Sequence, residues 1–242
     1  MNECIIFQYS GRFAHFLKAE ANASAPSYPF PSRTVLLGLV GAVLGLTKDT
    51  PQIILKDANF AVYGSSKTTH WHTAKMHQTY DPPLAFKLKR NSKGSGGSHK
   101  KQPKIITQEW LFKPNFTIYA QLPNEYQNDF EKRLKNREWY FTPSLGLSEM
   151  MADLKYINTV DLELLTDDTH KINTVVRKSQ VELNMEEIIE QNAVIKSIRM
   201  PRDVSKERRF THETYFYEVK GNSLSVKTAN AYRAKNKIIT WL

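Results

Sequence analysis

The fold can be worked out from one segment, Tyr28-Pro-Phe-Pro-Ser-Arg-Thr-Val-Leu-Leu-Gly-Leu-Val-Gly-Ala-Val-Leu-Gly45. Its prolines push the residues before them into extended geometry, so the first part is predicted to be a structured loop. Ser32 is a favourable N-cap, and the apolar residues 34–46 follow it. We therefore expect a loop that leads directly into a buried helix, which ends at Thr47-Lys-Asp-Thr-Pro51.

Three glycines, Gly38, Gly41 and Gly45, lie on one face of this expected helix. Each one costs up to ~1 kcal/mol relative to alanine, so something must approach that face closely enough to compensate. The chain's own sheet, another subunit and a ligand are the three possibilities. We expect the sheet.

Hydrophobic alternation predicts the other elements on both sides of this helix. The expected strands are residues 4–7, 59–63, 116–120, 156–165, 175–183 and 194–200, with 209–219 paired to 224–232. The expected further helices are an amphipathic one at residues 124–137 and a short one at residues 148–154.

The order of these elements is typical of an α+β protein with a ferredoxin-like (RRM-like) βαββαβ body. We assign residues 1–154 to this body and residues 155–242 to a β-rich C-terminal part. Residues 67–113 are interpreted as an inserted β-hairpin, with arms at 84–88 and 105–112 and a polar tip at 90–104.

The hairpin segment carries most of the positive charge. The chain has 34 Lys and Arg against 24 Asp and Glu, a formal charge of +10. Between Lys67 and Lys113 there are ten basic and two acidic residues, and Trp71, Tyr80 and Phe86 lie among them. Cations contact phosphates and rings stack on bases, so this composition favours a nucleic-acid contact. A solvated basic loop without a ligand is the alternative.

Other classes of protein fit the sequence poorly. The longest apolar run, residues 35–46, is shorter than the ~20 residues of a spanning helix, and the N-terminal residues have no signal-peptide pattern. We therefore expect a cytoplasmic protein without membrane contact. A single cysteine, Cys4, excludes an internal disulfide and a Cys-rich zinc site. No nucleotide-binding loop is present, so no cofactor is predicted.

A metal site is an alternative interpretation of His70-Trp-His72 with His77. No cysteine or suitable carboxylate lies near them in the sequence to complete a ligand set. We therefore predict no metal and expect these histidines to contact RNA.

Three motifs are similar to those of the CRISPR-associated Cas five family, within the RAMP superfamily. They are Gly11-Arg-Phe-Ala-His-Phe16, the Pro31-Ser-Arg-Thr-x-x-x-Gly-x-x-Gly41 pattern in the opening stretch, and Pro143-Ser-Leu-Gly-Leu-Ser148. The length and the Phe-Ala-His-Phe motif most resemble subtype I-B. The last ninety or so residues carry no recognised motif.

The resemblance implies a non-catalytic subunit of a type I CRISPR surveillance (Cascade) complex. Such a subunit caps the foot of the complex, grips the 5′ handle of crRNA with a ferredoxin-like body and a thumb hairpin, and contacts the backbone subunit and the large subunit. A contact with target DNA near the protospacer-adjacent motif is left open. The residues expected to bind RNA are Arg12, His15, Tyr28, Ser32, Arg33, Thr34, Lys67, His70, Trp71, His72, Lys75, Lys87, Lys89, Arg90, Lys100, Lys101, Lys104 and Gly146.

Arg33 is the candidate of greatest interest. With Ser32 and Thr34 it places a guanidinium, two hydroxyls and free backbone N–H groups at a helix N-terminus, which is a favourable site for a phosphate. The alternative is an arginine neutralised by a neighbouring carboxylate.

Two other functions remain open from the sequence. Members of the family in another subtype cleave repeat RNA without metal by means of Tyr, Lys and His, and this chain has His15, Lys18 and Tyr28. A metal-independent endoribonuclease is therefore one alternative. A generic single-strand RNA-binding protein is the other.

The charge map gives the first prediction. Replacing Lys87, Lys89 and Arg90 together with alanine should weaken RNA binding, because three phosphate contacts are lost. The negative slope of log K against log salt should become shallower by about 2. Titrations of a single-stranded RNA at several salt concentrations measure both. An unchanged slope would place the RNA elsewhere.

Overall fold

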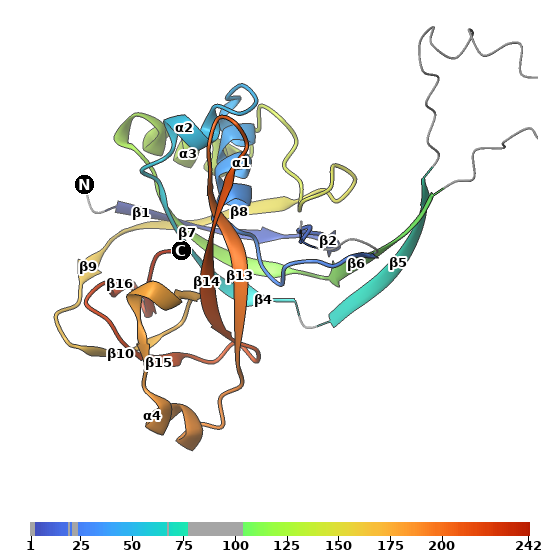
Figure 1. Ribbon diagram of the computed structural model, residues 1–242. Coiled ribbons are helices and arrows are strands. Elements are labelled where there is room, and N and C mark those ends of the chain that lie inside the picture. Colours follow the sequence, from blue (N-terminus) through green and yellow to red (C-terminus); the bar gives the residue numbers. More distant parts are fainter. Residues whose placement is uncertain (1–2, 19, 21–23, 67, 77–103) are drawn as a thin grey trace, which may run out of the picture.

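The computed structural model describes residues 3–18, 20, 24–66, 68–76 and 104–242. In these residues the protein is mixed α and β and rich in strands, which confirms the predicted α+β class (Figure 1). A central sheet has helices on one face and part of the C-terminal region, including Ala234 and Ile239, on the other. Met200 and Tyr215 of the same region join the core on the helical side. No helix in the described ranges is long and apolar enough to cross a bilayer.

The central sheet has the strand order β4-β7-β1-β8, and every neighbouring pair is antiparallel. Its strands are β1 (Glu3–Ser10), β4 (Asn59–Ser65), β7 (Asn115–Gln121) and β8 (Asp153–Asp161). The strands predicted at residues 4–7, 59–63 and 116–120 lie within it. Residue 154, where the sequence suggested a boundary, is inside β8, so the last sheet strand spans the two predicted parts.

Strand β1 is buried on both faces. Ile5, Phe7 and Tyr9 pack into the larger core with the helices, whereas Cys4 and Ile6 pack into a second core with residues of the C-terminal strands. Burial raises the pKa of the Cys4 thiol to about 12, so the sulfur is an inert core atom. Two layers thus depend on this one strand.

The helical face is formed by α1 (Arg33–Leu44), α2 (Pro51–Ile54) and α3 (Asn124–Asn136). The N-cap of α1 is Ser32, as predicted, and its hydroxyl accepts a hydrogen bond from the Val35 N–H at 3.4 Å. The helix ends before residue 46 because Gly45 takes a left-handed conformation with φ of 78°. In α3, Phe130 and Leu134 are buried on the predicted side.

The glycine face of α1 does not pack on the sheet, so that expectation was wrong. A Cβ at Gly41 would clash with Pro51 of α2, and one at Gly45 would meet the Tyr140 ring at 2.5 Å. Gly38 has open space beside it. The face of α1 with Leu36, Leu37 and Val40 is the one that enters the core, because larger apolar side chains bury more surface there.

A long hairpin projects from the body (Figure 1). Its strands are β5 (Thr68–Met76) and β6 (Lys104–Phe112), which pair antiparallel along their whole length. The arm predicted at residues 105–112 lies in β6, and the sequence had missed β5. The arm predicted at 84–88 lies outside the described residues. At its base β6 also pairs with β2 (Phe13–Ala14) and β3 (Ser24–Ala25).

The C-terminal part forms small sheets. Its elements are β9 (Glu163–Leu164), β10 (Thr169–Ile172), β11 (Val176–Arg177), η2 (Lys178–Gln180), β12 (Glu182–Leu183), α4 (Met185–Glu190), β13 (Ile195–Val204), β14 (Phe210–Glu218), β15 (Leu224–Lys227), β16 (Tyr232–Ala234) and β17 (Lys237–Ile239).

Three local predictions were wrong. The strand expected at residues 175–183 is interrupted by η2, so only the short strands β11 and β12 form there. Strand β14 pairs with β13 and β11 instead of β15, because Leu224 and Val226 of β15 join Ile172 in a separate small core. The helix expected at residues 148–154 is a turn, in which the Leu145 N–H donates to the Met150 carbonyl at 2.7 Å. Leu145 and Met150 are both buried, so core packing overrides the helical pattern.

The contact between α3 and β1 gives a stability prediction. The Phe130 ring is fully buried and packs edge-on against Phe7, with centroids 5.7 Å apart. Phe130→Ala should lower the free energy of unfolding by about 3–5 kcal/mol through a lost ring and a cavity. The exposed Lys132→Ala on the same helix should change it by less than about 0.5 kcal/mol. Urea denaturation measures both, and equal effects would contradict the packing.

Candidate nucleic-acid interface

Five of the predicted RNA-binding residues line one cavity of about 450 Å³: His15, Tyr28, Ser32, Thr34 and Gly146. The cavity lies between the N-terminal loops, the start of α1 and the middle of β6. The remaining lining residues are Phe16, Leu17, Ala25, Val35, Ile106, Gln108, Leu147, Pro201, Phe210 and His212. Residues from opposite ends of the sequence therefore form this site.

His15 is held by strand β6. Its Nδ1 lies 2.8 Å from the Glu109 carbonyl oxygen, and its backbone N–H donates to the Leu145 carbonyl at 3.0 Å. A carbonyl oxygen only accepts, so Nδ1 must carry a proton and donate. Nε2 is then the ring nitrogen that can accept a proton, or lose one if the ring is charged.

Tyr28 is positioned by a short two-stranded ribbon. Its N–H donates to the Phe16 carbonyl at 2.7 Å, and the Lys18 N–H donates to the Pro26 carbonyl at 3.0 Å. The Glu109 carboxylate accepts from the Ser27 N–H at 3.0 Å and ties the ribbon to β6. Burial raises the pKa of the Tyr28 phenol, so it stays protonated at neutral pH. Lys18 Nζ is 5.8 Å from its ring centroid.

Gly146 allows the motif loop to approach His15. Its φ is 98°, and a Cβ there would clash with the His15 carbonyl oxygen. Only glycine combines this backbone conformation with that contact. The glycine of the Pro143–Ser148 motif is therefore needed for the loop to pack against His15.

Arg33 does not present its guanidinium to the cavity, which corrects the leading sequence candidate. Its side chain is 4% exposed and forms an ion pair with Asp203 of β13. It also donates to the Lys56 carbonyl at 2.5 Å and to the Ala58 carbonyl at 3.0 Å. Burial lowers its pKa, and Asp203 opposes this shift. Arg33 is thus an arginine neutralised by a carboxylate, which was the alternative to a phosphate site, and the pair is buried on the Arg33 side.

Among the described residues, the hairpin positions predicted to bind RNA do not line the cavity, although Ile106 and Gln108 of β6 do. His70, Trp71 and Lys75 are exposed on β5, and the His72 ring stacks on Trp110 with centroids 4.1 Å apart. The exposed Arg12 lies over the Phe13 ring at 5.5 Å. Lys104 is the first residue of β6. Lys67, His77, Lys87, Lys89, Arg90, Lys100 and Lys101 lie outside the described residues.

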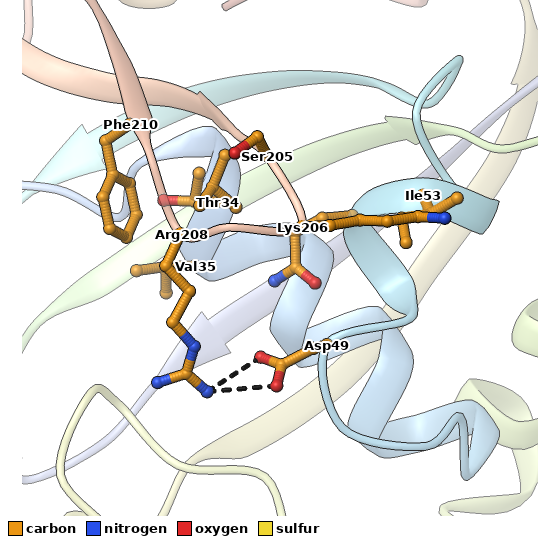
Figure 2. Close-up of a pocket in the computed structure, with 10 residues that line it drawn as sticks. Thr34, Val35, Asp49, Ile53, Ser205, Lys206, Arg208 and Phe210 are labelled. Atoms are coloured by element: carbon orange, nitrogen blue, oxygen red, sulfur yellow. Dashed lines mark hydrogen bonds and ion pairs between the residues drawn. The ribbon is translucent and has the colours of Figure 1, made fainter.

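The contribution of the β13–β14 hairpin was not predicted from the sequence. Its tip forms a second cavity of about 350 Å³ with α1 and α2, lined by Lys206, Arg208 and Phe210 among others (Figure 2). Two Arg208–Asp49 contacts of 3.1 and 3.0 Å cross this cavity. The run Arg199-Met-Pro-Arg-Asp-Val-Ser-Lys-Glu-Arg-Arg209, with five basic residues, was the available signal. The larger charge cluster in the hairpin segment obscured it.

The Gly146 contact can be tested against a second glycine. Gly221 also has a positive φ, of 83°, but open space beside it. Gly221→Ala should lower the free energy of unfolding by about 1–2 kcal/mol from backbone strain alone. Gly146→Ala should cost more, because His15 must also move. Urea denaturation measures the difference, and equal costs would exclude the close approach.

Comparisons with known proteins agree with this architecture. A chain described as "CRISPR RNA-guided surveillance complex" is similar in structure, with a TM-score of 0.53, 15% identity, and coverage of 92% of this chain and 91% of that one. A CRISPR protein from Archaeoglobus fulgidus has a TM-score of 0.50, 10% identity, and coverage of 98% and 97%. These likenesses concern the fold. No curated protein matches the chain in sequence.

The family comparison covers most of the chain. The model of the family described as CRISPR-associated protein (Cas_Cas5) matches residues 4–217. This range includes the loops that line the cavity, the hairpin strands β5 and β6, and the basic tip between β13 and β14. The chain therefore belongs to the CRISPR-associated Cas_Cas5 family.

Proposed function

We propose that this protein is a non-catalytic, RNA-binding subunit of a type I CRISPR surveillance complex, and that it holds the 5′ handle of crRNA. The observation that carries the proposal is the cavity at the base of the hairpin, where His15, Tyr28, Ser32, Thr34 and Gly146 meet. Its residues come from all three motifs that resemble the family.

The chemistry of the cavity supports single-stranded RNA as the ligand. Proteins read unpaired RNA by placing a base between apolar or aromatic side chains and by pairing its edge with polar groups. Phe16, Leu17 and Leu147 provide apolar walls, and the Ser32 and Thr34 hydroxyls and His15 provide polar groups. The hairpin with its excess of cations begins at the same strand, β6, and would hold the following phosphates.

Assembly with other subunits is part of the proposal. A third cavity, of about 660 Å³, lies along the glycine face of α1 and is bordered by the exposed rings of Tyr140 and Phe141. Exposed apolar surface of this kind is typical of a protein contact, and we assign it to the backbone subunit or the large subunit. Subtype I-B and a contact with target DNA near the protospacer-adjacent motif stay predictions from the sequence.

We also propose that the central sheet with α1 and α3 is a ferredoxin-like unit. The element order β1, α1, β4, β7, α3, β8 and the antiparallel strand order β4-β7-β1-β8 support it. The β5–β6 hairpin then lies between the second and third strands of this unit, where the sequence analysis placed the thumb.

A metal-independent endoribonuclease is the second candidate, and one observation favours it. His15 and Tyr28 line the same cavity, and Lys18 is next to the Tyr28 ring. In that reaction His15 Nε2 takes the proton of a ribose 2′-OH, and the 2′-oxygen attacks the phosphorus. The 5′-oxygen then leaves with a proton from the Tyr28 hydroxyl, while Lys18 stabilises the negative charge of the phosphorane. We assign His15 and Tyr28 to RNA binding and keep cleavage as the alternative.

One experiment separates these functions. The full-length protein is incubated in EDTA with CRISPR repeat RNA from its host and with a scrambled RNA of equal length. We expect at least ~10-fold tighter binding of the repeat-derived 5′ end and no cleavage, because groups that recognise single-stranded bases read their edges. A ~10-fold preference corresponds to about 1.4 kcal/mol.

The matched variants for this experiment are Tyr28→Phe and Tyr217→Phe. Tyr217 is a partly buried tyrosine of β14 that does not line the cavity. Equal binding of both RNAs would favour the generic RNA-binding protein. Specific cleavage that Tyr28→Phe abolishes and Tyr217→Phe retains would overturn the non-catalytic assignment.

A further inference from the structure

The two cavities beside α1 are parts of one groove. The cavity with His15 and Tyr28 and the cavity with Lys206 and Arg208 share three lining residues, Thr34, Val35 and Phe210. The groove therefore runs past the first turn of α1, beneath the β13–β14 hairpin. Its two halves have different chemistry, apolar on the Tyr28 side and charged on the Arg208 side.

Phe210 forms the wall between the two halves. It is the first residue of β14, and 52% of it is exposed. In Figure 2 its ring lies beside Thr34 and Val35, on the same hairpin as Ser205, Lys206 and Arg208. Exposing a large ring to water is unfavourable, so a phenylalanine here is well suited to stack on a planar ligand.

The charged half contains two cationic side chains, and one of them, Arg208, is in a weak ion pair. Arg208 pairs with Asp49 through Nη2, at 3.1 and 3.0 Å from the two carboxylate oxygens. Both side chains are more than half exposed, so water screens the pair and it adds little stability. A phosphate can replace the Asp49 carboxylate and keep the same hydrogen bonds. Lys206 lines the same half and adds a second positive charge.

Two amides are placed to contact base edges. The Gln108 side-chain carbonyl accepts from the Trp110 indole N–H at 3.2 Å, so its NH₂ group is left to donate. The Oε1 atom of Gln52 is buried without a hydrogen-bond partner among the described residues. A donor from a ligand, such as the exocyclic amino group of a base, would satisfy it.

We propose that this groove binds two successive nucleotides of single-stranded RNA on either side of Phe210. The base of the first nucleotide enters the apolar half and stacks on the Phe210 ring. The phosphate that links the two nucleotides displaces Asp49 from Arg208. The inference rests on the proposed RNA-binding function and assigns part of that binding to the C-terminal hairpin, which carries no motif of the family resemblance.

The test uses a matched pair of phenylalanines in the full-length chain. Phe141 is also 52% exposed, but it borders the cavity on the glycine face of α1, which we assign to a protein subunit that this RNA-binding assay does not contain. The probe is the host's CRISPR repeat RNA, with 2-aminopurine placed at one position of its 5′ end at a time. Stacking on a ring quenches the fluorescence of 2-aminopurine. Phe210→Ala should weaken binding by about 5- to 150-fold and remove the quenching at one position, whereas Phe141→Ala should change neither.

The outcomes separate this inference from the proposed function. If the wild-type protein binds no repeat RNA, the proposed function and the inference both fail. If it binds repeat RNA, but Phe210→Ala retains both the affinity and the quenching at every position, the inference alone is overturned. An equal loss in Phe141→Ala would also overturn it, because a general effect of losing an exposed ring would explain the result.

Displacement of Asp49 from Arg208 is tested separately, through RNA affinity and its salt dependence. Asp49→Asn releases Arg208, so this variant should bind the same RNA more tightly and with a steeper salt dependence. Asp161→Asn removes one negative charge from an exposed position at the end of β8 and serves as the control. Weaker binding by Asp49→Asn, or equal tightening in both variants, would overturn the contact between Arg208 and the phosphate.

Discussion

The buried guanidinium of Arg33 is the contact on which the candidate interface depends. It joins three segments that are far apart in the sequence: the first residue of α1, the carbonyls of Lys56 and Ala58 before β4, and Asp203 of β13. An arginine buried to this extent is stable only when its donors are satisfied, so the three segments must stay together. The β13–β14 hairpin is thereby fixed beside the start of α1, and the groove lies between them.

On the other side of the groove, strand β6 holds the cavity residues in place. One edge of β6 pairs with β5 along its whole length to form the projecting hairpin, and other residues of β6 pair with β2 and β3. The Glu109 carbonyl and carboxylate then hold His15 and Ser27. The cationic hairpin and the cavity therefore share one rigid strand, so RNA held by one would be presented to the other in a fixed direction.

The interface combines a rigid side with an adjustable one. His15, Tyr28 and Ser32 are buried and fixed by backbone hydrogen bonds, as suits a site that selects one shape of ligand. The tip of the β13–β14 hairpin is exposed and held to the loop between α1 and α2 by the screened Arg208–Asp49 pair. A surface of this kind can exchange an internal carboxylate for a phosphate at little cost in stability.

The sequence by itself determined many of the local elements and the residue types available for binding. Prolines, the Ser32 N-cap and apolar alternation act within a few residues, so α1, α3 and strands β1, β4 and β7 were predictable, as was the cationic hairpin segment. Only the tertiary structure decided which residues meet. Arg33 became a core ion pair because Asp203, 170 positions later, reaches it. Phe210 became a wall of the groove because β14 pairs with β13 instead of β15, and such long-range pairing depends on which apolar surfaces are buried together.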